Sequence, residues 1–255
     1  MNFRQFAYGL TFSFGIAWLA VVVIPFFKLR NPAPVSFQEG IDEQEGIYHP
    51  KRRGRVVNGY QVYAENGCYQ CHTQVVRNTD AGNDLGRKDW GGLQTDPETG
   101  RDTRRESNAF DYSGLDFAPI GVTRLGPDLM NVGIRVHERI RAEMSKGRGE
   151  DEDGLTFGEV DGVSREWFYL HLYDPRLFPE LSWSKCPPHR FLFEERKILG
   201  SRSTDALEVE TEPGLEIVPS DKARALVSYL ISLKHDDPVP AAMDYSDKSE
   251  EDKEG

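Results

Sequence analysis

The sequence predicts a mainly α-helical protein in which one N-terminal transmembrane helix precedes a helical domain with long loop insertions. Residues 6–27 carry no charge, and this apolar run is long enough to cross a hydrocarbon core as a helix. Apolar residues three or four apart indicate amphipathic helices after residue 56 and near residue 225. Polar, Gly-containing stretches typical of loops lie near residues 78–117, 145–162 and 194–219.

The first element is a membrane anchor over residues 1–30. A cleaved signal peptide is the alternative, but its apolar region is about 7–15 residues long and ends at small residues. Here the apolar run is longer and leads into Pro25–Arg30. We therefore expect the helix to be retained in a lipid bilayer. The polar segment 31–55, which begins Asn31-Pro32-Ala33-Pro34, is predicted to be a connector.

Charge is concentrated at the C-terminal end of the chain. The formal net charge is -11, and residues 236–255 hold eight acidic and two basic residues. This segment has no apolar period, so it is predicted to be a disordered acidic tail that follows a domain over residues 56–235. No long basic run is present, and nucleic acid is not expected as a partner.

Three helices are predicted in the domain. Val56, Tyr60 and Tyr63 share one face of the first, and Gly59 would let another helix cross closely. A second starts after Ser220, and its apolar stripe contains Ala223, Leu226, Val227, Leu230 and Leu233. A third is predicted over residues 164–171, with Trp167 and Leu170 facing a core.

The stretch Cys68-Tyr69-Gln70-Cys71-His72 carries the most specific chemistry in the sequence. A bare Cys-x-x-Cys also occurs in redox dithiols and in zinc ribbons, but a ribbon needs a second ligand pair, and only Cys186 remains. With a histidine directly after the second cysteine, the pattern is the attachment motif of c-type haem. It predicts one covalently bound haem c (iron), attached through Cys68 and Cys71, with His72 as the proximal iron ligand.

A pair of amphipathic helices around such a motif resembles the class I cytochrome c fold. The stretch Arg124-Leu125-Gly126-Pro127-Asp128-Leu129 matches the Gly-Pro-x-Leu element of that family. The resemblance implies that the Pro127 carbonyl accepts the free ring N–H of His72 and orients this ligand. On its own, Gly-Pro is a turn signal.

The order of elements further resembles the mono-haem membrane cytochrome c subunit (subunit II) of cbb3-type haem-copper oxidases. The match covers most of residues 5–77 and 119–193, and its most specific part is residues 67–77. The resemblance implies an electron-transfer subunit that passes electrons to an integral-membrane haem-copper catalytic subunit. Other cytochrome c subunits or a soluble electron donor would supply the electrons. It also implies a bacterial-type energy-transducing (inner) membrane, with the haem domain on the periplasmic side.

The charge distribution argues against that orientation. Arg4 alone precedes the apolar run, whereas Lys28, Arg30 and further basic residues follow it, so the positive-inside rule would place the domain in the cytoplasm. Attachment of c-type haem takes place on the outer side of the membrane. We let the motif decide the orientation.

The chain departs from the oxidase subunit at the second axial ligand. That family has methionine in a Ser-x-Met-Pro context, whereas this chain has Ser184-Lys185-Cys186-Pro187. Cys186 is therefore the first candidate for the sixth ligand and His189 the second. Met130, Met144 and an open five-coordinate site are the remaining alternatives. A thiolate would stabilise ferric iron and lower the reduction potential relative to methionine.

Two positions are candidates for contacts with haem propionates: His171 and Arg176. A lone histidine carries little information, so an ordinary helix histidine is the simpler interpretation of His171. The basic group Arg101, Arg104 and Arg105 is interpreted as a solvated face, with contacts to propionates or to a partner as the alternatives.

Two other functions fit part of the pattern. The small subunit of nitric oxide reductase also resembles one membrane helix followed by one c-type haem domain. A haem enzyme or gas sensor is the other, because Cys186 in place of methionine gives the iron an unusual sixth ligand.

Overall fold

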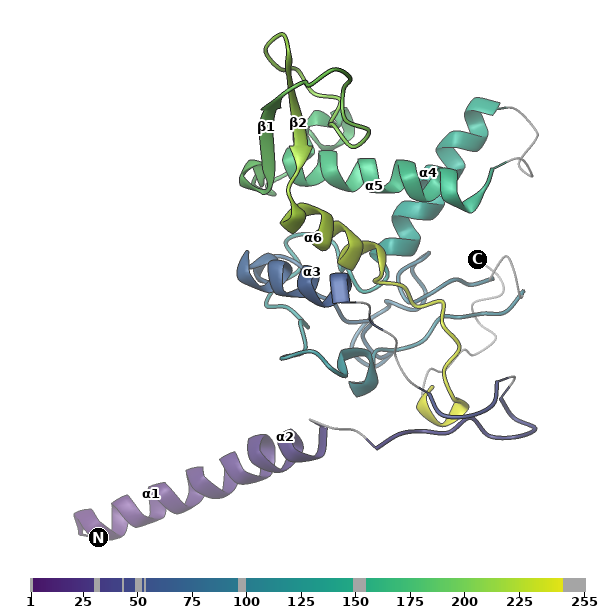
Figure 1. The fold of residues 1–255 in the computed structure, drawn as a ribbon. Coiled ribbons are helices and arrows are strands. Elements are labelled where there is room, and N and C mark those ends of the chain that lie inside the picture. Colours follow the sequence, from purple (N-terminus) through teal and green to yellow (C-terminus); the bar gives the residue numbers. More distant parts are fainter. Residues whose placement is uncertain are drawn as a thin grey trace. The chain divides into compact units, whose positions relative to one another are not determined.

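The structure is a computed structural model that describes residues 2–29, 33–42, 44–48, 52, 54–95, 100–148 and 155–244. Its contacts divide the chain into two compact units, which are described separately below. The first comprises residues 1–50, 108–118 and 239–243, and the second comprises residues 51–107, 119–238 and 244–255. Helices make up most of the regular structure in the described residues (Figure 1).

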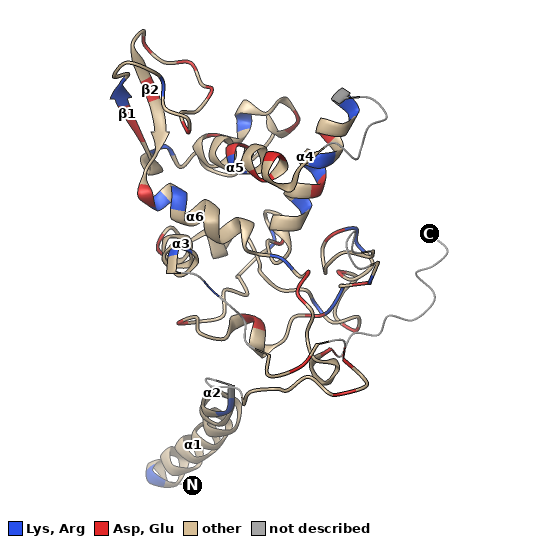
Figure 2. Ribbon diagram, turned by 45° about the vertical axis from the view of Figure 1, so that its right-hand side comes forward, with Lys and Arg blue, Asp and Glu red and all other residues tan. Residues whose placement is uncertain are grey.

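The N-terminal apolar run is a helix, as predicted. It consists of α1 (Phe3–Trp18), a π-helical turn (Leu19–Val23) and α2 (Ile24–Leu29). Asn2 caps it, accepting a hydrogen bond from the backbone N–H of Gln5 at 2.9 Å. Pro25 has no N–H to donate to the preceding turn, which accounts for the π-helical turn before it. The stretch Phe3–Lys28 is long and apolar enough to cross a membrane, and Figure 2 shows its charged residues only at its two ends.

The rest of the first unit is built from turns. A bridge joins Ser36 and Ile47, so the described part of the predicted connector has local structure. Short 3₁₀ turns follow at Ala109–Tyr112 and Ala241–Met243. The backbone N–H of Ala241 donates to the Asp42 carboxylate at 2.8 Å.

The prediction of a disordered tail over residues 236–255 is wrong for residues 236–244. Met243 is only 3% exposed, and its carbonyl accepts a hydrogen bond from the Asn108 amide at 3.2 Å. The prediction relied on the net charge of the whole segment, which does not reveal that the apolar residues near Met243 pack. Residues 245–255 lie outside the described part of the chain.

Two crossing helices form the centre of the second unit, as predicted. They are α3 (Gly54–Glu65) and α6 (Asp221–Ile231), and the Ser220 side chain caps α6. A Cβ on Gly59 would overlap the Ala225 carbonyl, so only glycine permits this approach. Of the apolar stripe predicted for this helix, Ala223, Leu226, Val227 and Leu230 are buried in the core. Leu233 lies beyond the end of α6 and is half-buried.

The region around residues 145–162 is more helical than predicted. Helix α4 (Val132–Arg148) was not expected, and α5 (Phe157–Tyr173) begins seven residues before the predicted start at Ser164. A capping box explains this early start, because Thr156 and Glu159 exchange side-chain to backbone hydrogen bonds. The buried face of α5 is formed by Val160, Ser164, Phe168 and Leu172, whereas Trp167 and Leu170 are half-buried. Residues 149–154 lie outside the described part of the chain.

The other two insertions differ from each other. Residues 194–219, predicted as extended pieces and turns, contain an antiparallel hairpin of β1 (Phe193–Lys197) and β2 (Leu215–Pro219). The described residues of 78–107 contain no helix or strand. The predicted solvated basic face is wrong at Arg104 and Arg105, which are 8% and 5% exposed. Arg104 is held by the Asp102 carboxylate at 2.8 Å and the Leu85 carbonyl at 3.1 Å, which compensates its burial.

Candidate functional site

The Cys68–His72 motif follows directly on α3. Gly67 adopts a left-handed conformation with φ of 66° and ends the helix. A 3₁₀ turn over Cys68–Gln70 follows, in which the Cys68 carbonyl accepts the N–H groups of Cys71 at 3.2 Å and His72 at 3.1 Å. The two thiols and the imidazole are thus carried by one hydrogen-bonded turn.

The His72 ring is oriented by the segment that contains Gly126 and Pro127. Its Nδ1 lies 2.8 Å from the Pro127 carbonyl oxygen, so the contact that the resemblance implied is present. With Nδ1–H donating to this carbonyl, Nε2 carries the lone pair that can bind a metal. A Cβ on Gly126 would overlap the ring, so glycine is needed here for the close approach. Burial lowers the pKa of His72 and favours the neutral form required of a ligand.

Hydrogen bonds join the motif to residues 120–129 along their length. Backbone bonds run from Val122 to Tyr69, from Gly126 to Cys71 and from Leu129 to Thr73, at 2.8–2.9 Å. The Thr123 hydroxyl adds a bond to the Gln70 carbonyl at 2.6 Å. These bonds fix His72 and Pro127 relative to each other, which explains the short contact between them.

A group of buried charges lies next to this pair of segments. Asp84 and Asp128 are each 1% exposed. Burial tends to raise the pKa of Asp84, but hydrogen bonds from Arg124 and Arg77 outweigh it and hold the pKa well below its usual range. Asp128 accepts the Thr73 hydroxyl at 2.5 Å, yet burial raises its pKa. The sequence alone indicates no role for Asp84, Arg124 or Asp128. The i,i+4 spacing of Arg124 and Asp128 was the only local signal.

Cys186 lies on the segment after α5, near the motif cysteines. Burial and then Cys186 raise the pKa of Cys68 to about 11, and burial and then Cys71 raise the pKa of Cys186. The Cys186 thiol therefore lies within electrostatic range of Cys68 and Cys71. The Cys186 backbone N–H donates to the Ser184 hydroxyl at 3.2 Å.

His171 and His189 lie in the same region. Burial lowers the pKa of His171 to about 4, with further contributions from His72 and then His189. Burial and then His72 lower the pKa of His189. The backbone N–H of His189 donates to the Leu172 carbonyl at 2.8 Å, and His171 stacks on Trp167 at 4.8 Å. Both histidines have a buried Nδ1 without a hydrogen-bond partner among the described residues.

Arg176 binds protein groups. Its guanidinium lies 2.9 Å from the Asp174 carboxylate and donates to the carbonyls of Cys186 at 3.2 Å and Ser184 at 3.5 Å. Arg176 therefore stabilises the backbone conformation around Cys186. The predicted propionate contact remains a prediction for both Arg176 and His171.

The residues present fit a covalently attached haem. The thiols of Cys68 and Cys71 and the imidazole of His72 lie on one turn. The Nδ1 atom of this imidazole contacts the Pro127 carbonyl oxygen. The Cys186 thiol lies within electrostatic range of Cys68. A porphyrin supplies four nitrogen ligands of its own, so the protein needs to give only the axial ones. In the described residues, no three His, Cys, Asp or Glu side chains are arranged to hold a metal ion by themselves.

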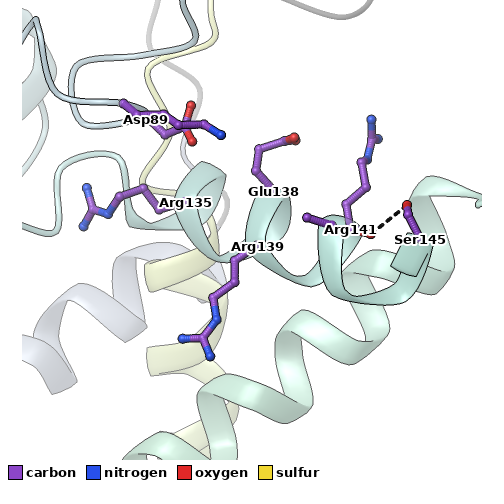
Figure 3. Close-up of a pocket in the computed structure, with 8 residues that line it drawn as sticks. Asp89, Arg135, Glu138, Arg139, Arg141 and Ser145 are labelled. Atoms are coloured by element: carbon purple, nitrogen blue, oxygen red, sulfur yellow. Dashed lines mark hydrogen bonds between the residues drawn. The ribbon is translucent and has the colours of Figure 1, made fainter. Parts of the chain in front are cut away.

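A groove of about 540 Å³ lies elsewhere, along α4. Four basic residues contribute to its lining, but Figure 3 shows the guanidinium groups of Arg135, Arg139 and Arg141 pointing away from one another. Arg139 is already paired with Glu143 at 2.9 Å and also with Glu180 at 2.5 Å. Because its charges do not converge, we do not assign this groove as the site.

Comparison of the sequence with known proteins gives no match to a family model and no match among curated proteins.

Proposed function

We propose that the chain is a membrane-anchored mono-haem c-type cytochrome with a class I cytochrome c-like domain. The observation that carries the proposal is the 2.8 Å contact between His72 Nδ1 and the Pro127 carbonyl, in a turn that also bears Cys68 and Cys71. The close crossing of α3 and α6 at Gly59 supports the domain assignment.

Each residue of the motif then has one task. The haem, when bound, would supply the one-electron oxidation and reduction. Cys68 and Cys71 would hold it through thioether bonds, and His72 would provide one nitrogen ligand. Pro127 keeps the imidazole in the tautomer that leaves Nε2 available and raises its basicity.

Cys186 is the first candidate for the second axial ligand, and His189 is the alternative. The electrostatic influence of Cys186 on Cys68 supports its nearness, and Arg176 holds its carbonyl in place. Met130 is a weaker candidate because its backbone is tied to Asp128, next to Pro127, at 2.8 Å. Met144 lies on α4, which belongs to neither of the two segments that form the site around His72.

The function we propose is electron transfer to the catalytic subunit of a haem-copper terminal oxidase in a bacterial-type inner membrane. The N-terminal helix would anchor the chain in the bilayer, with the haem domain on the periplasmic side. A cytochrome c subunit or soluble donor would deliver the electrons. A haem enzyme or gas sensor is the second candidate function. It is favoured by Cys186, which stands where the oxidase subunits have their methionine ligand.

Covalent haem attachment is the first test. The full chain is produced in membranes of a bacterium that matures c-type cytochromes. Haem is then counted per chain after denaturation. We expect one haem to stay with the wild type and with Cys186→Ser, and none to stay with the double variant Cys68→Ser, Cys71→Ser. Release of all haem from the denatured wild type would overturn the proposal.

Copurification is the second test. We expect detergent extracts to contain the chain with a large haem-copper subunit that reduces oxygen. Reduction of nitric oxide alone would assign the chain to the reductase. Rapid binding of carbon monoxide by the isolated full chain, with no partner subunit, would favour the sensor.

A further inference from the structure

We propose that Asp84 and Arg124 are positioning residues for His72, forming a charge-paired clamp that holds the Pro127 carbonyl on the imidazole and thereby sets the reduction potential. This inference rests on the proposed function. It also assigns a role to the insertion over residues 78–117, which contains Asp84. The sequence alone indicates no role for this insertion.

Arg124 joins the two segments of the site by side-chain bonds. Its Nε donates to the Thr73 hydroxyl at 2.8 Å, and its Nη2 donates to the Val75 carbonyl at 2.8 Å. Thr73 follows His72 directly, and Arg124 lies three residues before Pro127. One guanidinium thus fastens the chain that carries the ligand to the chain that carries its orienting carbonyl.

Asp84 holds this guanidinium in a fixed orientation. Its two carboxylate oxygens accept Nη1 at 2.9 Å and Nη2 at 2.8 Å of Arg124, which is a bidentate pair. The same carboxylate accepts the backbone N–H of Arg77 at 3.0 Å and its guanidinium at 2.9 Å. Because Asp84 is buried and bonded on both sides, Arg124 has little freedom to turn.

The effect on the iron would pass through the His72 ring. A carbonyl that is held firmly against Nδ1–H strengthens this hydrogen bond and raises the basicity of the imidazole. A more basic imidazole would donate more electron density to the iron and favour its ferric state. Loosening the clamp should weaken that hydrogen bond and raise the reduction potential. A purely structural role would lower stability and leave the potential unchanged.

The test uses variants that keep the net charge, since a lost charge changes the potential by itself. Arg124→Lys retains the positive charge, but an ammonium group cannot reproduce the bidentate contact. Asp84→Glu retains the negative charge and displaces the carboxylate. The matched control is Arg196→Lys, because Arg196 pairs with the buried Glu216 in the β1–β2 hairpin at 3.0 Å. Midpoint potential, electron paramagnetic resonance and thermal melting are measured on the full chain in detergent.

We expect both test variants to keep one covalent haem, to show a higher midpoint potential and to give broadened low-spin signals. Arg196→Lys should melt earlier without a shift in potential. Midpoint potentials of Arg124→Lys and Asp84→Glu equal to that of the wild type would overturn the proposal that Asp84 and Arg124 position His72. If neither variant accumulates, Asp84→Asn with Arg124→Gln removes both charges together and must show the same upward shift. Absence of covalent haem from the wild type would count against the proposed function instead.

Discussion

The segment that bears His72 and the segment that bears Cys186 are held in different ways. Around His72, backbone bonds and buried side chains tie residues 69–75 to residues 120–129. Around Cys186, the bonds come mainly from Ser184 and the partly exposed Arg176, and the neighbouring Trp183 is 73% exposed. The contrast shows that the His72 side of the site is fixed by many contacts of the fold, whereas the Cys186 side depends on few.

The largest effect is expected for Gly126→Ala on the His72 side. The added Cβ overlaps the imidazole, so ring and backbone must separate, at a cost of about 1–3 kcal/mol in the free energy of unfolding. Denaturant titration in detergent measures the loss. Gly162→Ala in α5 is the control, because a Cβ there meets nothing within 4 Å. Equal stability of the two variants would mean that the His72 side tolerates movement.

Thr73→Val is expected to rank second. It leaves the buried Asp128 carboxylate without its 2.5 Å hydroxyl donor, which should cost about 1–3 kcal/mol. Thr123→Val, at an exposed position whose hydroxyl bonds to Gln70, should cost less. Thermal melting compares the two. A larger loss for Thr123→Val would contradict the importance assigned to burial.

Arg176→Gln tests the Cys186 side and should have a smaller effect on stability. The guanidinium is partly exposed, so losing its ion pair with Asp174 should cost about 0.2–1 kcal/mol. We expect more heterogeneous low-spin resonance signals, because the chain around Cys186 is less constrained. A loss as large as that of Thr73→Val would remove the contrast between the two sides.

Cys186→Ala is expected to change stability least, by about 0.5 kcal/mol or less, because the side chain is small and partly exposed. Its spectrum should change most, with the thiolate-type low-spin signal lost while one covalent haem remains. His189→Ala serves as the comparison. Identical spectra for wild type and Cys186→Ala would show that Cys186 is not the ligand.

Local signals in the sequence were sufficient where neighbouring residues decide the structure. The apolar N-terminal helix, the Ser220 cap and the stripe of α6 follow from composition and spacing, and all are present. The Cys68–His72 turn is likewise a local pattern. The early start of α5 was missed, although Thr156 and Glu159 carry a capping signal.

Contacts between residues distant in the chain were decided only by the tertiary structure. Asp84 and Arg124 are separated by 40 positions, and neither residue type predicts a buried ion pair at that distance. Arg104 and Arg105 were predicted to be solvated because charged side chains are usually exposed. In the fold both are buried, and the partners of Arg104 compensate its burial. By itself the sequence pointed to the residues that we propose attach and ligate a haem, because that chemistry depends on spacing within one turn. Which groups hold His72 in place was decided by packing, because those groups come from separate segments that meet only in the folded chain.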